Sequence, residues 1–363
     1  MPIYGALGLP ENDRSLVNNI GEGVVYTAAQ AFIQRHNADM EQAYNMFVEG
    51  TTENNKDYYK LPGGGRLQRL GNRSRAAATK AGGRWDVAFP LENFGAAFEF
   101  SKVDMAYMTV EQFANELATI RTQDVSTIRH EILLRLMNNE VRSFVDEIPH
   151  NPGTLSIQPL ANGDSVIYPP VIGAASDAGA TEDHYLVSGY LATAIDDDNN
   201  PLPVIRGELE EHFGTPTGYG NVCVFINTAQ VAVVKALLDF TDVTDIGITP
   251  GDDTATVNSA PMGPGRLIGR CDGVWVFEWR HIPAGYMLGV DADQPGPVKI
   301  RVHPTGINLA QGLALVTEDE RHPIMARNYE HWMGVGAGNR LNGVVMELKA
   351  SGNYAAPSLY ASY

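Results

Sequence analysis

The sequence predicts an α+β fold organised around one long helix. Residues 109–147 contain no proline and no glycine, and apolar side chains recur there at steps of three and four, which is the spacing of one helical face. Residues 51–102 change from a polar, glycine-rich stretch to alternating aromatic residues, a pattern typical of paired strands. Beyond residue 150, short apolar runs alternate with turns rich in glycine and proline, which indicates many short strands rather than a helical bundle.

The long helix is predicted to begin after Thr109 and to reach Glu147. Thr109 is a suitable N-cap, and Gln112 stands three residues later, as a capping box requires. Pro149 cannot continue the helix. At about 1.5 Å per residue an unbroken helix of this length would span roughly 55–60 Å, which predicts an extended architecture.

An earlier helix is predicted from Val24 to Phe47, after an irregular arm over residues 1–22. Apolar residues recur along it at helical spacing, and His36 falls on the same face. A histidine in that position is expected to pack in the core rather than to bind a metal.

Residues 51–102 predict a long two-stranded ribbon with a basic tip. Trp85, Val87 and Phe89 alternate as in a strand, and Phe98 and Phe100 resume the pattern. A two-stranded ribbon alone is only marginally stable in water. We therefore expect another subunit to cover its aromatic face.

The second half of the chain predicts short strands and one further helix. Asn227 or Thr228 is expected to cap an amphipathic helix that reaches Phe240. The expected strands cover residues 154–160, 164–171, 222–226, 274–279, 286–290, 298–303, 307–316, 327–332 and 341–349.

Charge is distributed unevenly along the 363 residues, whose net charge is −17. Residues 146–260 hold seventeen acidic and two basic residues, whereas residues 60–84 hold seven basic and no acidic ones. A basic arm and an acidic body can attract a second copy of the chain. An alternative interpretation stays equally open: the acidic residues only confer solubility, and the basic loop is only solvated. The net charge argues against tight binding to nucleic acid, because that affinity rests largely on phosphate neutralisation.

No segment approaches the ~20 apolar residues of a membrane span, and the N-terminus has no secretory signal pattern. Two cysteines, Cys223 and Cys271, cannot form a disulfide framework, so we expect buried thiols and synthesis in the cytoplasm.

Motifs for catalysis or cofactor binding are weak throughout. Residues 334–338 (GVGAG) resemble part of a dinucleotide fingerprint but lack its final glycine, so a hairpin turn is predicted there. Glu210, Glu211 and His212 are adjacent in sequence and are therefore expected to point in different directions. Neither H-E-x-x-H nor G-x-S-x-G occurs. The sequence thus predicts no catalytic residue, no cofactor and no metal site. The absence of motifs does not by itself exclude an enzyme; that the protein is no enzyme is implied only by the resemblance given next.

The order of these elements resembles the major capsid proteins of tailed bacteriophages, which share the Hong Kong 97 phage capsid fold. That resemblance implies an N-terminal arm with the first helix (1–50), an extended β-hairpin or E-loop (51–104), and the spine helix of a peripheral P-domain (105–150). An axial A-domain (151–297) and the return strands of the P-domain (298–363) would follow. The strand, proline–glycine turn and strand over 274–291 also resemble this family.

The resemblance implies a structural protein that assembles through pentamers and hexamers into an icosahedral shell around phage double-stranded DNA. It places the protein in the virion after assembly in the host cytoplasm, with scaffolding, portal and possibly decoration proteins as partners. DNA would be contacted weakly and non-specifically, and no membrane or cofactor is implied. The expected inter-subunit contacts lie in the E-loop: Lys60, Arg66, Arg69, Arg73, Arg75, Arg84, Trp85 and Phe89.

Two alternatives stay open. The first is the shell protein of an encapsulin-type nanocompartment, which has the same fold but encloses enzymes instead of DNA. Encapsulins resemble shorter versions of the phage capsid proteins. A soluble α+β hydrolase that uses Asp and Glu predicts a small oligomer and a deep acidic cleft, and it leaves the basic ribbon unexplained.

Overall fold

The long helix α4 runs from Val110 to Met137 in a computed structural model of the chain. Its predicted start is confirmed, because the Thr109 and Gln112 side chains form both hydrogen bonds of a capping box. The structure describes residues 3–4, 9–10, 16–60, 70, 72, 75, 84–147, 153–173, 179–212, 221–243, 264–321 and 324–362.

The predicted helix end at Glu147 is wrong, since α4 stops ten residues earlier. The C-cap Asn138 is extended; its Oδ1 accepts from Glu140 N at 2.8 Å and its Nδ2 donates to Tyr360 O at 2.9 Å. An asparagine side chain that bonds main-chain groups competes with helical bonding. Strand β7 (Arg142–Asp146) follows and pairs antiparallel with β8 (Gly153–Ile157). The apolar residues of this stretch therefore follow strand alternation, not helical periodicity.

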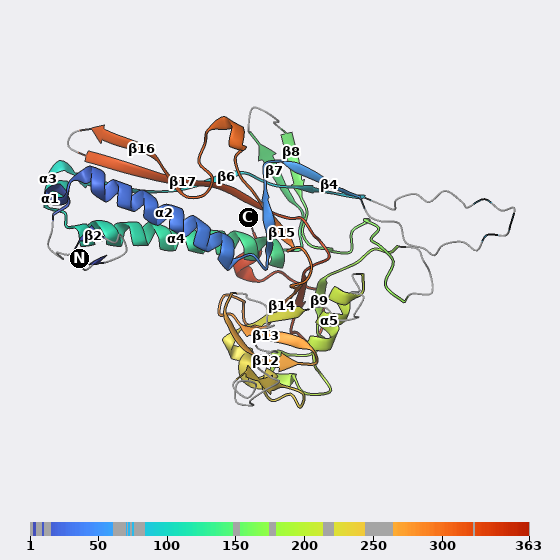
Figure 1. Cartoon of the computed structure of the whole chain (residues 1–363). Coiled ribbons are helices and arrows are strands. Elements are labelled where there is room, and N and C mark those ends of the chain that lie inside the picture. The colour runs from blue at the N-terminus through green and yellow to red at the C-terminus, as the bar shows by residue number, and fades with distance from the viewer. Residues whose placement is uncertain are drawn as a thin grey trace.

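Helix α2 (Glu22–Ala43) lies along α4, and strands β16, β17 and β6 flank the two helices (Figure 1). The aromatic residues Phe98, Phe100, Phe113 and Tyr329 are buried between these elements. The arm before α2 holds the paired strands β1 (Ile3–Tyr4) and β2 (Leu9–Pro10) and the short helix α1 (Val17–Ile20). The resemblance to tailed-phage capsid proteins implies a P-domain for most of this elongated half.

One mixed sheet completes this half, with strand order β16-β17-β15-β3 and β6 paired to β17. Strand β6 forms ten consecutive antiparallel pairs with β17, from Ser101↔Ile324 to Glu92↔Met333. Helix α3 follows β6 directly, with Ser101 as its N-cap. The bounds are β3 Val48–Thr52, β6 Glu92–Ser101, α3 Lys102–Tyr107, β15 Val298–Arg301, β16 Ala314–Arg321 and β17 Ile324–Ala337.

The other half is a seven-stranded sheet of order β11-β12-β13-β10-β14-β18-β9. The sheet is fully buried at its centre, in β10. The bounds are β9 Tyr185–Val187, β10 Val222–Ile226, β11 Thr241–Asp242, β12 Arg266–Cys271, β13 Val274–Glu278, β14 Tyr286–Asp291 and β18 Val344–Glu347. Both cysteines are buried free thiols here, as expected.

Helix α5 (Leu202–Glu210) covers one face of this sheet, although the sequence reading treated its start only as part of an acidic loop. Its buried residues Leu202, Ile205 and Leu209 are spaced for one helical face. The helix predicted up to Phe240 is instead a 3₁₀ turn, Thr228–Gln230, followed by α6, Val231–Val234. Asp197 Oδ1 accepts a hydrogen bond from Leu238 N at 2.8 Å, which takes that amide out of a helical pattern.

Three strands pair differently from their places in the predicted order of elements. Strand β6, predicted as part of the ribbon, belongs to the mixed sheet through β17. Strand β18, which the resemblance implied among the P-domain return strands, pairs with β14 in the seven-stranded sheet. Strand β8, which it implied in the A-domain, pairs with β7 in a two-stranded unit. The pairings of β6 and β18 join residues far apart in sequence, which local patterns do not encode.

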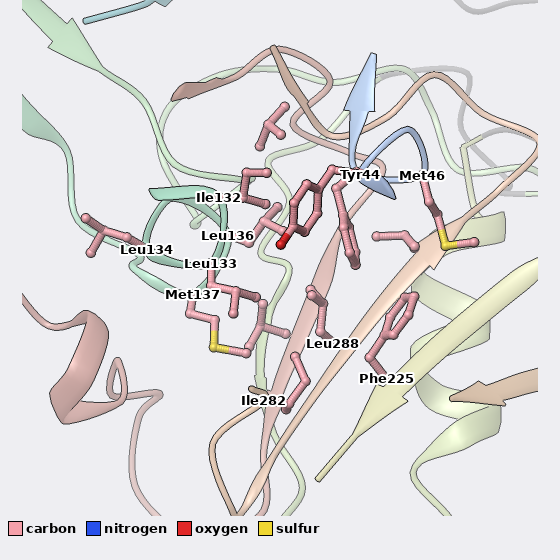
Figure 2. Packing of buried hydrophobic residues seen from close by; sticks show 14 of the residues in the cluster. Tyr44, Met46, Ile132, Leu133, Leu134, Leu136, Met137, Phe225, Ile282 and Leu288 are labelled. Carbon is pink, nitrogen blue, oxygen red and sulfur yellow. The ribbon is translucent and has the colours of Figure 1, made fainter. Parts of the chain in front are cut away.

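The two halves share a hydrophobic core at the C-terminal end of α4. Figure 2 shows Leu133, Leu136 and Met137 of α4 in one cluster with Phe225 and Leu288 of the seven-stranded sheet. All five are wholly buried. The helix therefore contacts both sheets. Among the described residues, none of the helices combines the length and hydropathy needed to cross a bilayer.

A buried ionic cluster joins α2, α4 and β17. Asp124 Oδ2 lies 2.8 Å from His36 Nε2, and Asp124 Oδ1 lies 2.7 Å from His331 Nδ1. Burial alone would raise the pKa of Asp124, but the hydrogen bonds from the two histidines outweigh it and leave the pKa below its usual value. His36 thus packs in the core, as predicted, and also holds a carboxylate.

We expect Asp124→Asn to destabilise the chain by about 1–3 kcal/mol, because one histidine loses its charged acceptor. A carboxylate whose pKa is depressed on folding stabilises the folded state above its unfolded pKa, and that contribution is lost as the pH falls through the folded pKa. The difference in free energy of unfolding between wild type and variant should therefore stay constant at neutral pH and decrease only below about pH 4. Urea unfolding at several pH values measures this difference. A difference that disappears between pH 8 and pH 6 would contradict this account.

Candidate inter-subunit interface

The ribbon consists of β4 (Lys56–Lys60) and β5 (Arg84–Ala88), which pair antiparallel. Tyr59 lies opposite Trp85, and Lys60 lies opposite Arg84 at the outer end of the pair. Figure 1 shows β4 leading away from the helical body. The segment that carries most of the basic residues therefore starts from a defined two-stranded base.

The predicted contact residues divide into three groups. Lys60 and Arg84 end the paired strands, and Arg75 is exposed. Arg66, Arg69 and Arg73 lie outside the described residues. Trp85 and Phe89 form the third group, and the prediction that another subunit covers them needs correction.

Trp85 and Phe89 are covered by their own chain and not by a second subunit. Trp85 is 6% exposed and Phe89 is 0% exposed. The Trp85 ring stacks on Tyr59 at 5.6 Å and meets Tyr168 at 5.3 Å between centroids. The expectation that a neighbour must cover this face is therefore wrong, because the loop around Tyr168, which is distant in sequence, already covers it.

Arg340 holds that covering loop in place. Its guanidinium donates to the carbonyls of Pro159 and Leu160 at 2.8 and 3.1 Å, and lies 2.8 Å from Asp164 Oδ2. The side chain is 1% exposed. A buried arginine with several acceptors fixes the path of the chain around it, so the seat of the Trp85 ring is rigid.

A second buried arginine holds the base of the ribbon. Arg301 Nη1 donates to Asp146 Oδ2 at 2.8 Å and to the Phe89 carbonyl at 3.0 Å. It joins β15, β7 and the residue that follows β5 by one position. The ribbon is thus anchored to both β7 and β15.

The glycines of residues 334–338 permit this anchoring. They were predicted to form a hairpin turn, but Gly334 and Gly336 lie inside β17, so that prediction is wrong. A Cβ on Gly334 would overlap the main-chain carbonyl of Pro90, and one on Gly336 would lie 2.6 Å from Phe89 Cδ1. The glycines leave room for the chain at the ribbon base to cross the strand.

Charges near the ribbon base are already paired within the chain. Lys56 lies 3.1 Å from Asp86, and Lys299 lies 3.4 Å from Glu49. Burial would lower the pKa of Lys299, but its hydrogen bond with Tyr59 and the charge of Glu49 raise it overall. Lys56 and Lys299 are therefore already neutralised by carboxylates of their own chain.

The sequence analysis did not predict the exposed apolar side chains beside the ribbon as contact residues. Tyr58 is 62% exposed on the strand face opposite to Tyr59, and Val141 and Val145 are 49% and 61% exposed at β7. The alternation of residues in the strand around Tyr58 could have predicted that its side chain is exposed. Val141 and Val145 were assigned to the apolar face of the long helix, so their exposure could not be predicted.

The acidic loop at residues 196–198 satisfies its own polar groups. Asp196 Oδ1 accepts from the main-chain amides of Asp198 and Asn199 at 3.1 and 2.9 Å. Asp197 and Asp198 are exposed. This loop presents negative charge on the surface of the seven-stranded half.

Taken together, the long helix, the ribbon, and the two sheets define a class: the chain has the fold of the major capsid proteins of tailed phages. A chain of the solved structure of Mycobacterium phage Patience aligns with this chain at a TM-score of 0.67 and 19% identity, over 93% of this chain and 91% of that one. The mature capsid of bacteriophage PhiM1 aligns at TM-score 0.49 and 9% identity, over 85% and 88% of the two chains. The capsid of Ralstonia phage GP4 aligns at 0.48 and 9%, over 83% and 85%. No family model and no curated protein matches the sequence.

Proposed function

We propose that the chain is the structural subunit of a phage capsid, which self-assembles through pentamers and hexamers into an icosahedral shell around double-stranded DNA. The observation that carries this proposal is the fold, shared with a phage chain over 93% of the sequence. Its place is the virion, after assembly in the host cytoplasm, and its role is mechanical rather than enzymatic.

The ribbon supplies a physical reason for assembly. Its base is anchored by Arg301 and by the buried Trp85, so that its direction is set before a neighbour is met. In the sequence, residues 60–84 hold seven basic residues and no acidic ones, and the surplus of acidic residues falls within 146–260. A basic ribbon over the acidic surface of the next copy is a heterologous contact, and such contacts close into rings when the rotation permits.

Further partners follow from a shell role. Scaffolding, portal and decoration proteins would act at assembly, at the DNA entry vertex and on the outer surface. The net charge of −17 keeps contact with the packaged DNA weak and non-specific, since the wall and the DNA have the same sign. Exposed Tyr58, Val141 and Val145 would be covered by a neighbouring subunit.

The first test is negative-stain microscopy with light scattering on the purified protein. Closed particles, or free pentamers and hexamers, are the expected result. A monomer or dimer that persists at high concentration would overturn the shell proposal. Particles that hold protein cargo and lack nucleic acid would instead favour a nanocompartment.

Changing Arg66, Arg69, Arg73 and Arg75 together to glutamate is expected to abolish closed particles. The reversal moves the ribbon by eight charge units and turns attraction to an acidic neighbour into repulsion. The yield of particles in a sucrose gradient, compared with wild type, measures the effect.

The matched control changes the same four residues to lysine, which keeps the charge and should keep most of the particles. Equal melting temperatures of the unassembled chains would show that both variants fold. Normal assembly of the glutamate variant would exclude charge on the ribbon as the cause of subunit association.

A further inference from the structure

Five ligand-type side chains gather where α5 ends beside β9. Glu208 belongs to α5, and Glu211 and His212 follow its end. Glu182 and His184 precede β9. Although Glu211 and His212 are neighbours in sequence and were expected to diverge, His212 Nε2 lies 3.2 Å from Glu211 Oε1 and 3.6 Å from Glu182 Oε1.

His184 supplies the observation that points to a ligand. It is wholly buried, and its Nδ1 lies 2.8 Å from the Gly343 carbonyl oxygen. A carbonyl oxygen only accepts hydrogen bonds, so Nδ1 carries the proton and Nε2 has the free lone pair. This Nε2 is buried and has no hydrogen-bond partner among the residues that the structure describes.

The donor atoms converge in two overlapping groups. A ring nitrogen of His184 and carboxylate oxygens of Glu208 and Glu211 lie within 4.8 Å of one another. Atoms of Glu182, Glu211 and His212 form a second such group. Glu211 belongs to both groups and therefore joins them.

Three carboxylates in this half-buried place repel one another. His212 lies beside them with its side chain 1% exposed. A bound divalent cation would neutralise this charge, which is costly to bury uncompensated.

We propose that His184, Glu208 and Glu211 form a structural site for a transition-metal ion of the zinc class, with Glu182 and His212 as further donors beside Glu211. An imidazole ligand with carboxylates favours Zn²⁺ over Ca²⁺ or Mg²⁺, which prefer oxygen ligands alone. The Gly343 carbonyl orients His184 as the second layer of a metal site commonly does. The site is independent of the proposed shell function.

Such an ion would tie three parts of the chain together. His184 O accepts from Val345 N at 2.9 Å, which joins the site to β18. Glu211 O accepts from Ile172 N at 2.7 Å, which joins it to the loop that leads to β9. The metal would therefore lock the C-terminal end of α5 and this loop onto the edge of the seven-stranded sheet.

The test uses the purified full chain, treated with EDTA, dialysed against buffer, and titrated with Zn²⁺. Elemental analysis should find one zinc per chain, and the melting temperature should rise with free zinc, as mass action requires of an ion bound only by the folded state. The double variant Glu182→Gln/Glu211→Gln should bind zinc at least about tenfold more weakly. Its matched control, Glu116→Gln/Asp198→Asn, removes two exposed carboxylates elsewhere and should bind as wild type does.

Co²⁺ gives a second measurement that does not depend on stability. Its visible absorption should show tetrahedral coordination in the wild type and in the control, and should be lost in the double variant. Equal zinc binding by the double variant and the control would overturn the proposal. Ca²⁺ or Mg²⁺ raising the melting temperature as much as Zn²⁺ would overturn the assignment to the zinc class.

Discussion

Asp146→Ala is expected to lower the free energy of unfolding by about 3–5 kcal/mol, the cost of leaving a buried charge without its partner. Asp146 Oδ2 accepts from Arg301 Nη1 at 2.8 Å, and the two side chains are 1% and 6% exposed. Without the carboxylate, the Phe89 carbonyl, 3.0 Å away, is the one hydrogen-bond acceptor that the guanidinium keeps among the described residues. Urea unfolding of the unassembled chain measures the loss.

The effect should extend beyond local stability, because the same arginine holds the base of the ribbon. We therefore expect particle yield to fall together with stability in this variant. The control Asp198→Ala removes an exposed carboxylate and should change stability by less than about 0.5 kcal/mol.

A double variant distinguishes the loss of the ion pair from the loss of the packing volume of its side chains. Asp146→Leu with Arg301→Met removes both charges, and its cost should be well below the sum of the two single changes. Additive costs, or a loss below about 1 kcal/mol for Asp146→Ala, would show that the pair is solvated rather than buried.

Gly334→Ala is expected to cost about 3 kcal/mol, at the upper end of overpacking in a close-packed interior. Its new methyl group would overlap the carbonyl of Pro90, and Pro90 Cγ would lie 3.0 Å away. A main-chain carbonyl cannot rotate aside as a side chain can, so β17 and the base of the ribbon would have to separate. Thermal and urea unfolding measure the loss.

Gly207→Ala is the matched control. Gly207 is exposed in α5, and a Cβ there would meet nothing within 4 Å. Alanine in an exposed helix should stabilise the chain by about 0.5–1 kcal/mol. The two Gly→Ala changes should thus have opposite signs. If Gly334→Ala leaves the free energy of unfolding unchanged, the segment around Pro90 can move away from β17.

Local signals predicted the starts of elements well. The Thr109 capping box and the Asn227 cap both form, because each involves residues at most three positions apart. The paired base of the ribbon was found as well, since alternation at Trp85 and Val87 matches β5. The ends were less predictable: the apolar residues of 141–145 fit either period, and only pairing with β8 decides for a strand.

The candidate site was only partly readable from the sequence. Basic residues of 60–84 and acidic residues of 146–260 are visible in composition, and they suggest contact between copies. That Trp85 faces Tyr168 of its own chain, and that Glu211 and His212 meet Glu182, depends on residues tens of positions apart. No local pattern records such meetings.

The sequence by itself therefore determined the α+β class, the long capped helix, the basic ribbon and the uneven charge, because each follows from neighbouring residues and their periodicity. The tertiary structure alone decided which sheet receives β18, what covers Trp85, and why Gly334 has no side chain. These depend on close packing between distant segments, where a single methyl group or carboxylate decides whether two parts of the chain can meet.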